Sequence, residues 1–207
     1  AKLLGTEIIS ADSMQIYKYM DIGTAKVTPD EADGVIHHMT DIVSPLENYS
    51  VCDYVKAARS AAEDIQDRGL VPLIVGGTGL YVDALTGRLS FDDDASSDPQ
   101  YRSELNALCK ERGAEFVHNV LKNVDKASAD AIHPNNIKRV IRALEYYQQT
   151  GQKISEHNEA EREKESAYNS AYFVLTDDRK ILYDRIDKRV DLMMQEGLLE
   201  ENSEHLL

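Results

Sequence analysis

Within the first 90 residues, segments with short continuous apolar runs are separated by a segment whose apolar residues recur with a helical period. Residues 7–10 and 71–75 are apolar runs of the kind that form buried strands. Residues 50–68 between them carry one apolar helical stripe that includes Tyr54. Ser50 can cap this helix, with Asp53 three residues on, and Gly69 terminates it. The order strand, helix, strand, glycine turn, helix predicts a parallel α/β sheet, and such sheets bind ligands at the carboxyl ends of their strands. Asp12 and Thr78 both follow strands at that edge.

The pattern becomes wholly helical after an acidic, serine-rich stretch at residues 89–99, where Asp98 and Pro99 predict a helix start. Further helices are expected to about residue 165, one of them from about Asn135 to Thr150.

A β-like run at residues 171–176 and a long helix from about 178 to 196 then return the chain to the core. We therefore predict an α/β core formed by residues 1–92 and 170–207, interrupted by an all-helical insertion domain of residues 93–169. Both ends stop within a predicted element, so we expect a fragment of a longer protein.

Composition narrows the class of protein. The chain has 207 residues and a net charge of −14, which argues against bulk electrostatic attraction to nucleic acid but leaves room for a local basic patch. It has no apolar stretch of membrane-spanning length and no signal-peptide pattern, so we expect a cytosolic protein without a membrane partner.

The first candidate for chemistry is Asp12, which follows a predicted strand and precedes Ser13 and Gln15. A carboxylate at this edge could accept a proton from a ligand in the cleft. Taken alone, Asp12 is more readily explained as a residue that forms a turn or caps the next element. Its polar neighbours and the downstream sequence DIGTAK favour a functional role.

The sequence VGGTGLY, residues 75–81, is the second candidate. Its glycines would let backbone N–H groups approach an anionic ligand, and a helix N-terminus follows. It lacks the Lys-Ser/Thr ending of a phosphate-binding P-loop, and a tight strand-to-helix turn is the simpler alternative.

Two helices carry cations in positions that invite a ligand. Lys138, Arg139 and Arg142 fall opposite the apolar face of the helix near residues 135–150, so contact with phosphates and a solvated helix face are both open. The last helix is expected to form an apolar face from Leu182, Ile186, Val190 and Met193. Arg179 falls within that face and Arg185 at its margin, which fits either an ion pair or an anionic ligand.

The pair His37-His38 is not expected to bind a metal. Adjacent residues of an extended segment point to opposite faces, so one packed and one exposed histidine is the expected outcome.

These stretches together resemble the tRNA dimethylallyltransferases. The resemblance is an ordered series of segments that spans nearly the whole chain: EIISADSMQIYKYMDIGTAK, GVIHHMTDI, ENYSVCDYVKAA, PLIVGGTGLYVDAL, HPNNIKRVIRALE and LYDRIDKRVDLMMQEGLLEE.

The resemblance implies a P-loop NTPase-like sheet core, a nucleotide-binding fold class, with a helical insertion that grips the anticodon arm of tRNA. It implies transfer of a dimethylallyl group from dimethylallyl diphosphate to the exocyclic amine of the adenine just 3′ of the anticodon. It also implies that Mg²⁺ accompanies the diphosphate and that the protein is a monomer.

Carried over residue by residue, the resemblance makes Asp12 the general base and Thr78 a catalytic residue that contacts the substrate from the glycine-rich turn. Arg179 and Arg185 are expected near the diphosphate, as further catalytic residues. The residues expected to contact tRNA are Asp12, Ser13, Met14, Gln15, Thr78, Arg102, Lys138, Arg139, Val140, Ile141 and Arg142.

Two segments of the family pattern are missing: the N-terminal phosphate loop ending in Gly-Lys-Thr, expected upstream of Ala1, and a basic C-terminal segment. This chain by itself is therefore expected to be inactive, and it offers no metal ligands that we can identify. Two alternatives remain: an enzyme that prenylates a free adenosine phosphate, and an RNA-binding domain without catalysis.

Overall fold

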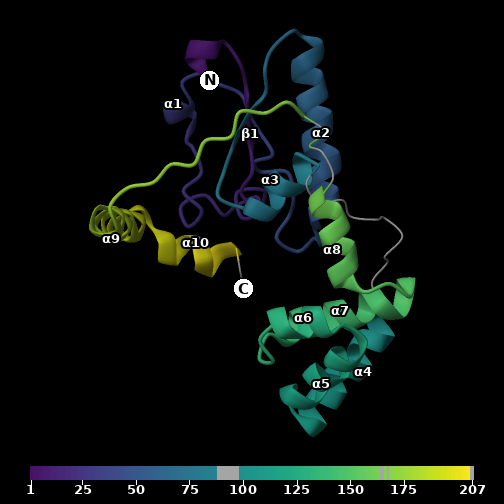
Figure 1. Cartoon of the computed structure of the whole chain (residues 1–207). Helices are drawn as coiled ribbons and strands as arrows, with labels where there is room; N and C mark the ends of the chain where they lie inside the picture. The colour runs from purple at the N-terminus through teal and green to yellow at the C-terminus, as the bar shows by residue number, and fades with distance from the viewer. Residues whose placement is uncertain (88–97, 164–165, 167, 206–207) are drawn as a thin grey trace. The chain divides into compact units, whose positions relative to one another are not determined.

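The computed structural model describes residues 1–87, 98–163, 166 and 168–205 (Figure 1). The chain divides into two compact units, a sheet unit of residues 1–86 and 168–207 and a helical unit of residues 87–167. The predicted boundary between residues 92 and 93 lies outside the described residues. Among the described helices, none is both long and apolar enough to cross a membrane.

The sheet unit contains three parallel strands in the order β2-β1-β3. Its elements are η1 (Lys2–Leu4), β1 (Ile8–Ser10), α1 (Pro29–Ala32), β2 (His37–His38), α2 (Val51–Asp67), β3 (Leu73–Val75), α3 (Gly79–Leu85), α9 (Arg179–Glu196) and α10 (Leu198–His205). The predicted parallel α/β core is confirmed. Strand β2 was not predicted, because two residues are too few to show a strand pattern in the sequence.

Helix α2 begins as predicted. Ser50 and Asp53 form a reciprocal capping box that satisfies backbone N–H groups at the helix start. The helix lies beside the sheet in Figure 1 and packs its apolar stripe, with α3, against the face of β1 that presents Ile9 and Ala11. Because side chains alternate along a strand, Ile8 and Ser10 point to the opposite face.

An ion cluster closes the amino end of this core, next to β1. Both oxygens of Glu7 pair with the guanidinium of Arg68, and Nε2 of His38 lies 2.6 Å from Glu7 Oε2. These hydrogen bonds, from Arg68 first and then from His38, lower the pKa of Glu7 to about 2. The expectation of one packed and one exposed histidine was wrong: both are half-buried, because His37 lies along a cavity and His38 contacts Glu7.

The C-terminal part of the sheet unit differs from the prediction. Residues 171–176 form no regular secondary structure and are exposed, because no described strand lies beside them to complete a ladder. Helix α9 has nearly the predicted bounds, but it buries none of its residues, and the expected apolar-face residues Leu182, Ile186 and Val190 are exposed.

The helical unit has its own core. Its helices are α4 (Pro99–Arg112), α5 (Ala114–Val124), α6 (Lys126–Ala131), α7 (Ile137–Thr150) and α8 (Ile154–Glu163). Asp98 caps α4 and Pro99 begins it, as predicted. Leu105, Val117 and Leu121 are among the buried residues that hold α4, α5 and α7 together.

Candidate active site at the carboxyl edge of the sheet

The ends of β1 and β3 are joined directly to one another. The backbone N–H of Ala11 donates to the carbonyl of Val75 (2.8 Å), and the N–H of Thr78 donates back to the carbonyl of Ala11 (3.0 Å). Two residues beyond Ala11, the N–H of Ser13 donates to Oγ1 of Thr78 at 2.9 Å. The structure therefore brings the Asp12-Ser13 segment together with Thr78, which lies 65 residues beyond Ser13 in sequence.

Gly76 makes this close approach possible. A Cβ at this position would lie 2.7 Å from Cα of Ala11, and closer still to the Ala11 carbonyl group. Real Cβ atoms essentially never come within 3.0 Å of such an atom. The first glycine of the turn is thus required by the crossing of two backbones, which is one of the uses of glycine beside a ligand site.

Asp12 forms a turn with one of its carboxylate oxygens. Oδ1 accepts hydrogen bonds from the N–H groups of Met14 (2.8 Å) and Gln15 (3.3 Å), which is the geometry of an Asx turn. Among the described residues, none donates a hydrogen bond to Oδ2. Asp12 is half-buried. Because Oδ1 accepts both hydrogen bonds of the turn, the carboxylate is held in place while Oδ2 keeps its capacity to accept a proton.

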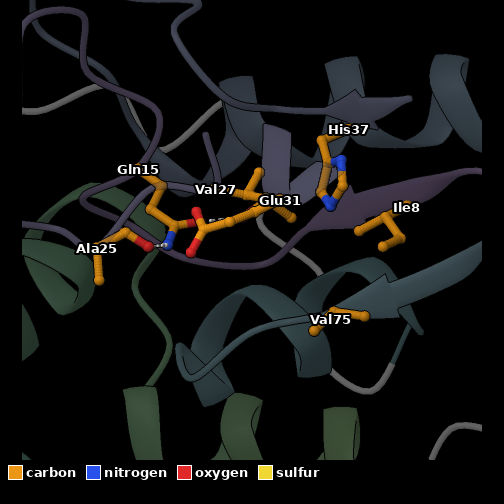
Figure 2. Close-up of a pocket in the computed structure, with 8 residues that line it drawn as sticks. Ile8, Gln15, Ala25, Val27, Glu31, His37 and Val75 are labelled. Carbon is orange, nitrogen blue, oxygen red and sulfur yellow. Dashed lines mark hydrogen bonds between the residues drawn. The ribbon is translucent and has the colours of Figure 1, made fainter. Parts of the chain in front are cut away.

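Gln15 connects the strand end to the loop that follows. Its Oε1 accepts a hydrogen bond from Ser10, and its Nε2 donates to the carbonyl groups of Thr24 (3.1 Å) and Ala25 (3.3 Å). The side chain lies at one end of a cavity of about 340 Å³, away from Ile8 and Val75 (Figure 2). Asp12, Ser13, Met14 and Thr78 are not among the residues that line this cavity.

A pair of stacked tyrosines supports the strand end from the other face of β1. The rings of Tyr54 and Tyr81 are 3.9 Å apart, and the hydroxyl of Tyr54 donates to the carbonyl of Ser10. Burial, followed by the nearby charges of Tyr17 and Asp12, raises the pKa of Tyr81. Sequence reasoning assigned Tyr54 only to a helix stripe and missed this pair.

Lys26 is a structural cation of the loop. Its Nζ contacts the carbonyl of Tyr17 and the carboxylates of Asp21 and Asp41, and its side chain is only 6% exposed. With its hydrogen bonds directed at these partners, Lys26 holds the segment from residue 17 to residue 26 closed on itself.

Arg179 and Arg185 lie on α9, and both are exposed. Nη1 of Arg185 is 3.3 Å from a carboxylate oxygen of Asp177. Among the described contacts, none joins either arginine to Asp12 or Thr78, so their expected place beside a diphosphate stays a prediction.

In the helical unit, the expected RNA contacts divide into two groups. Lys138 and Arg139 lie on α7, where Lys138 is exposed. Val140 and Ile141 are buried, with 0% and 3% exposure, and pack their side chains into the core of this unit, so their expected contact with tRNA stays a prediction. Their positions follow from the helical period, which turns them away from the cations beside them.

Two arginines of the same unit converge on a buried carboxylate. Arg102 Nη2 lies 2.6 Å and Arg142 Nη1 3.4 Å from Oε2 of Glu145, which is fully buried. Oε1 of Glu145 accepts the backbone N–H of Asp98 at 3.0 Å. Sequence reasoning named both arginines and missed the carboxylate that orients them, although a glutamate on an apolar helix face was the available signal.

The described residues do not by themselves form a metal site. Among them, no three His, Cys, Asp or Glu side chains gather closely enough to hold an ion. The described side chains therefore do not fit a metal centre formed by protein ligands alone.

The fold and site together define the class: an α/β protein with a P-loop NTPase-like core, in which the glycine-rich turn meets the Asp12-Ser13 segment at the carboxyl edge of a parallel sheet. The family model described as IPP transferase matches residues 15–207. The chain therefore belongs to the IPP transferase family, and the resemblance noted from the motifs is confirmed.

Two curated relatives share the name tRNA dimethylallyltransferase. The chain is 51% identical over 201 residues to a tRNA dimethylallyltransferase of Lachnoclostridium phytofermentans, an alignment that covers 97% of this chain and 64% of that protein. It is 52% identical to the Bacillus licheniformis protein of the same name, over 97% and 63% of the two chains. The chain thus spans less than two thirds of the length of these relatives.

Solved structures agree with this assignment. A tRNA isopentenylpyrophosphate transferase from Bacillus halodurans is 45% identical with a TM-score of 0.63, over 98% of this chain and 62% of that one. A eukaryotic dimethylallyltransferase described as acting on tRNA is 31% identical with a TM-score of 0.82, over 98% and 50% of the two chains.

Proposed function

We propose that the full-length protein transfers a dimethylallyl group from dimethylallyl diphosphate to the N6 amine of the adenine on the 3′ side of the anticodon in tRNA. Family membership and the names of the relatives support this proposal. The observation that carries it is the carboxylate of Asp12, held by its own turn beside Thr78, with no donor to Oδ2 among the described residues.

The geometry suits base catalysis on a weak nucleophile. The adenine nitrogen attacks C1 of the dimethylallyl group as the C–O bond to the diphosphate breaks, and the diphosphate leaves with the electron pair. Oδ2 of Asp12 takes the proton that the amine must lose, while Oδ1 keeps its bonds to two backbone N–H groups and holds the carboxylate in place. The adenine must leave its stack to be reached.

RNA recognition is assigned to local positive charge. With a net charge of −14, the chain as a whole repels a polyanion, so binding requires concentrated cations. Arg102 and Arg142 are half-exposed, and their two positive charges exceed the single negative charge of Glu145. Lys138 and Arg139 add two further positive charges to the same unit. The partner that fits is an anticodon stem-loop. In this proposal, Ser13, Met14 and Gln15 contact the target adenine, and the cations contact phosphates of the RNA.

The diphosphate is assigned to Arg179 and Arg185, since guanidinium groups suit bidentate contact with phosphate. We further propose that Mg²⁺ accompanies the diphosphate. Mg²⁺ commonly binds through substrate phosphates with few protein ligands. No step above is routed through it. The full-length protein is proposed to work as a monomer in the cytosol.

The test is direct transfer of a labelled dimethylallyl group by the full-length gene product. An anticodon stem-loop RNA with adenine 3′ of the anticodon should be labelled, and the same stem-loop with guanine at that position should not. Labelling of free adenosine monophosphate in preference to the RNA would support the nucleotide-prenylating alternative. Tight binding of the RNA without any transfer would support the non-catalytic one.

A further inference from the structure

Three consecutive backbone N–H groups of the loop converge on one distant carboxylate. Oε2 of Glu201 accepts hydrogen bonds from Asp21 and Ile22 at 2.7 Å each, and Oε1 accepts one from Gly23 at 3.0 Å. The separation in sequence between Asp21 and Glu201 is 180 residues. Burial opposes ionisation of Glu201, but the hydrogen bonds from Gly23, Ile22 and Asp21 outweigh it and lower its pKa.

Close packing accompanies these hydrogen bonds. A Cβ on Gly23 would lie 3.1 Å from Cδ1 of Leu198, at the start of α10, and 3.5 Å from Oε1 of Glu201. The loop backbone therefore touches α10 through both an apolar side chain and a carboxylate. The segment also contains Ala25 in the left-handed region, with φ of 49°, a conformation that persists only when its surroundings hold it.

The clamped segment is the one that positions Gln15. Immediately after Gly23, the carbonyl groups of Thr24 and Ala25 accept the two hydrogen bonds of the Gln15 amide. The N–H of Gln15 in turn donates to Oδ1 of Asp12. A chain of hydrogen-bonded groups thus runs from α10 through the loop to the segment that includes the proposed base.

We propose that Glu201 is a positioning residue: it clamps residues 21–23 so that the loop presents Gln15 to the RNA. This inference rests on the proposed function, in which residues 12–15 contact the target adenine and its neighbours. Glu201 acts only through the loop. Losing the clamp should weaken productive RNA binding and leave the diphosphate substrate unaffected.

The test compares Glu201→Gln with Glu200→Gln in the full-length protein. Both remove one negative charge from α10, but Glu200 is exposed and its carboxylate touches none of the three loop donors. In Glu201→Gln, amide hydrogen exchange of the peptide covering residues 20–26 should accelerate at least tenfold, with exchange in α2 unchanged. Its KM for the stem-loop RNA should rise at least fivefold, with KM for dimethylallyl diphosphate unchanged. Glu200→Gln should match the unmodified protein in all of these.

A merely structural role gives a different pattern, because partial unfolding lowers the active fraction and hence apparent kcat without moving KM. Unchanged exchange at residues 20–26, or an unchanged KM for the RNA, overturns the proposal. If the unmodified protein transfers nothing, the proposed function fails and the positioning role fails with it, while hydrogen exchange still decides whether the clamp exists.

Discussion

Gly76→Ala is the substitution with the sharpest structural consequence at the site. The added methyl group would be forced against the backbone of Ala11, with its Cα only 2.7 Å away. Backbone of a central strand cannot rotate aside as a long side chain can, so the ends of β1 and β3 must separate. Inserting a methyl group into packed structure costs about 1–3 kcal/mol, and a backbone neighbour places this case near ~3 kcal/mol.

The expected effects follow from that displacement. For a chain of this size about 1 kcal/mol lowers Tm by 2–4 °C, so Gly76→Ala should lower Tm by roughly 6–12 °C. Moving Asp12 and Ser13 by ~1 Å relative to Thr78 should also reduce kcat/KM by about 10²-fold, because catalysis depends on such positioning. Differential scanning calorimetry and prenyl transfer by the full-length protein measure the two effects.

Gly77→Ala is the matched control. A Cβ at Gly77 meets no atom within 4 Å, and its backbone is outside the left-handed region. The control should therefore be neutral or slightly stabilising, since alanine reduces the freedom of the unfolded chain. If the two variants have equal Tm and equal activity, the argument that two crossing backbones require Gly76 is refuted.

Three further predictions concern charges. Glu145→Gln should destabilise the protein by ~1–3 kcal/mol in urea unfolding, since it weakens charge-assisted hydrogen bonds from Arg102 and Arg142. As a control, Glu104→Gln at an exposed position should change the free energy of unfolding by less than about 0.5 kcal/mol. Equal effects of the two substitutions would contradict a stabilising role for the buried carboxylate. The pKa of Glu7 is lowered from 4.5 to about 2, so the stability that its carboxylate contributes is complete well above pH 4.5 and is lost as pH falls from 4.5 towards 2. In acid unfolding followed by circular dichroism, the Glu7→Gln variant should therefore lose less stability over that interval than the unmodified protein. An equal loss would contradict a stabilising ion cluster at Glu7. Replacing Lys138 and Arg139 together by alanine should weaken RNA binding and make log K against log salt shallower by roughly 1.4–1.8, and an unchanged slope would exclude phosphate contact.

Much of the core could be predicted because its local signals agree. Ser50 and Asp53 formed the capping box expected at the start of α2, and Asp98 and Pro99 began α4 as their residue types indicate. In both cases the hydrogen bonds that define the helix start are made within a single helical turn, so short-range sequence contains the information.

The failures share a physical cause, which is dependence on distant partners. Residues 171–176 have strand composition, but a strand needs a neighbour, and the described residues supply none. The apolar stripe of α9 likewise has no described surface to cover it. Periodicity predicts which residues of an element share a face, but it does not predict what packs against that face.

The site could be predicted only in part for the same reason. Asp12 and Thr78 were expected to meet because parallel strands end at one edge, and their segments do meet through Ser13. Glu201 and Glu145 were missed although each ends one of the quoted family segments, since both contact residues that are far away in sequence. Val140 and Ile141 were carried over with a motif although the helical period already placed them in the core.

The central claim is that Asp12 removes the proton from the attacking amine. The most direct measurement is the single-turnover rate of prenyl transfer by full-length Asp12→Asn, with RNA affinity measured in parallel. Asparagine keeps an oxygen to accept from Met14 and Gln15, so the turn and the RNA affinity should persist while the rate falls by about 10²–10⁴-fold. A rate near that of the unmodified protein, with the RNA bound equally well, would show that some other group takes the proton.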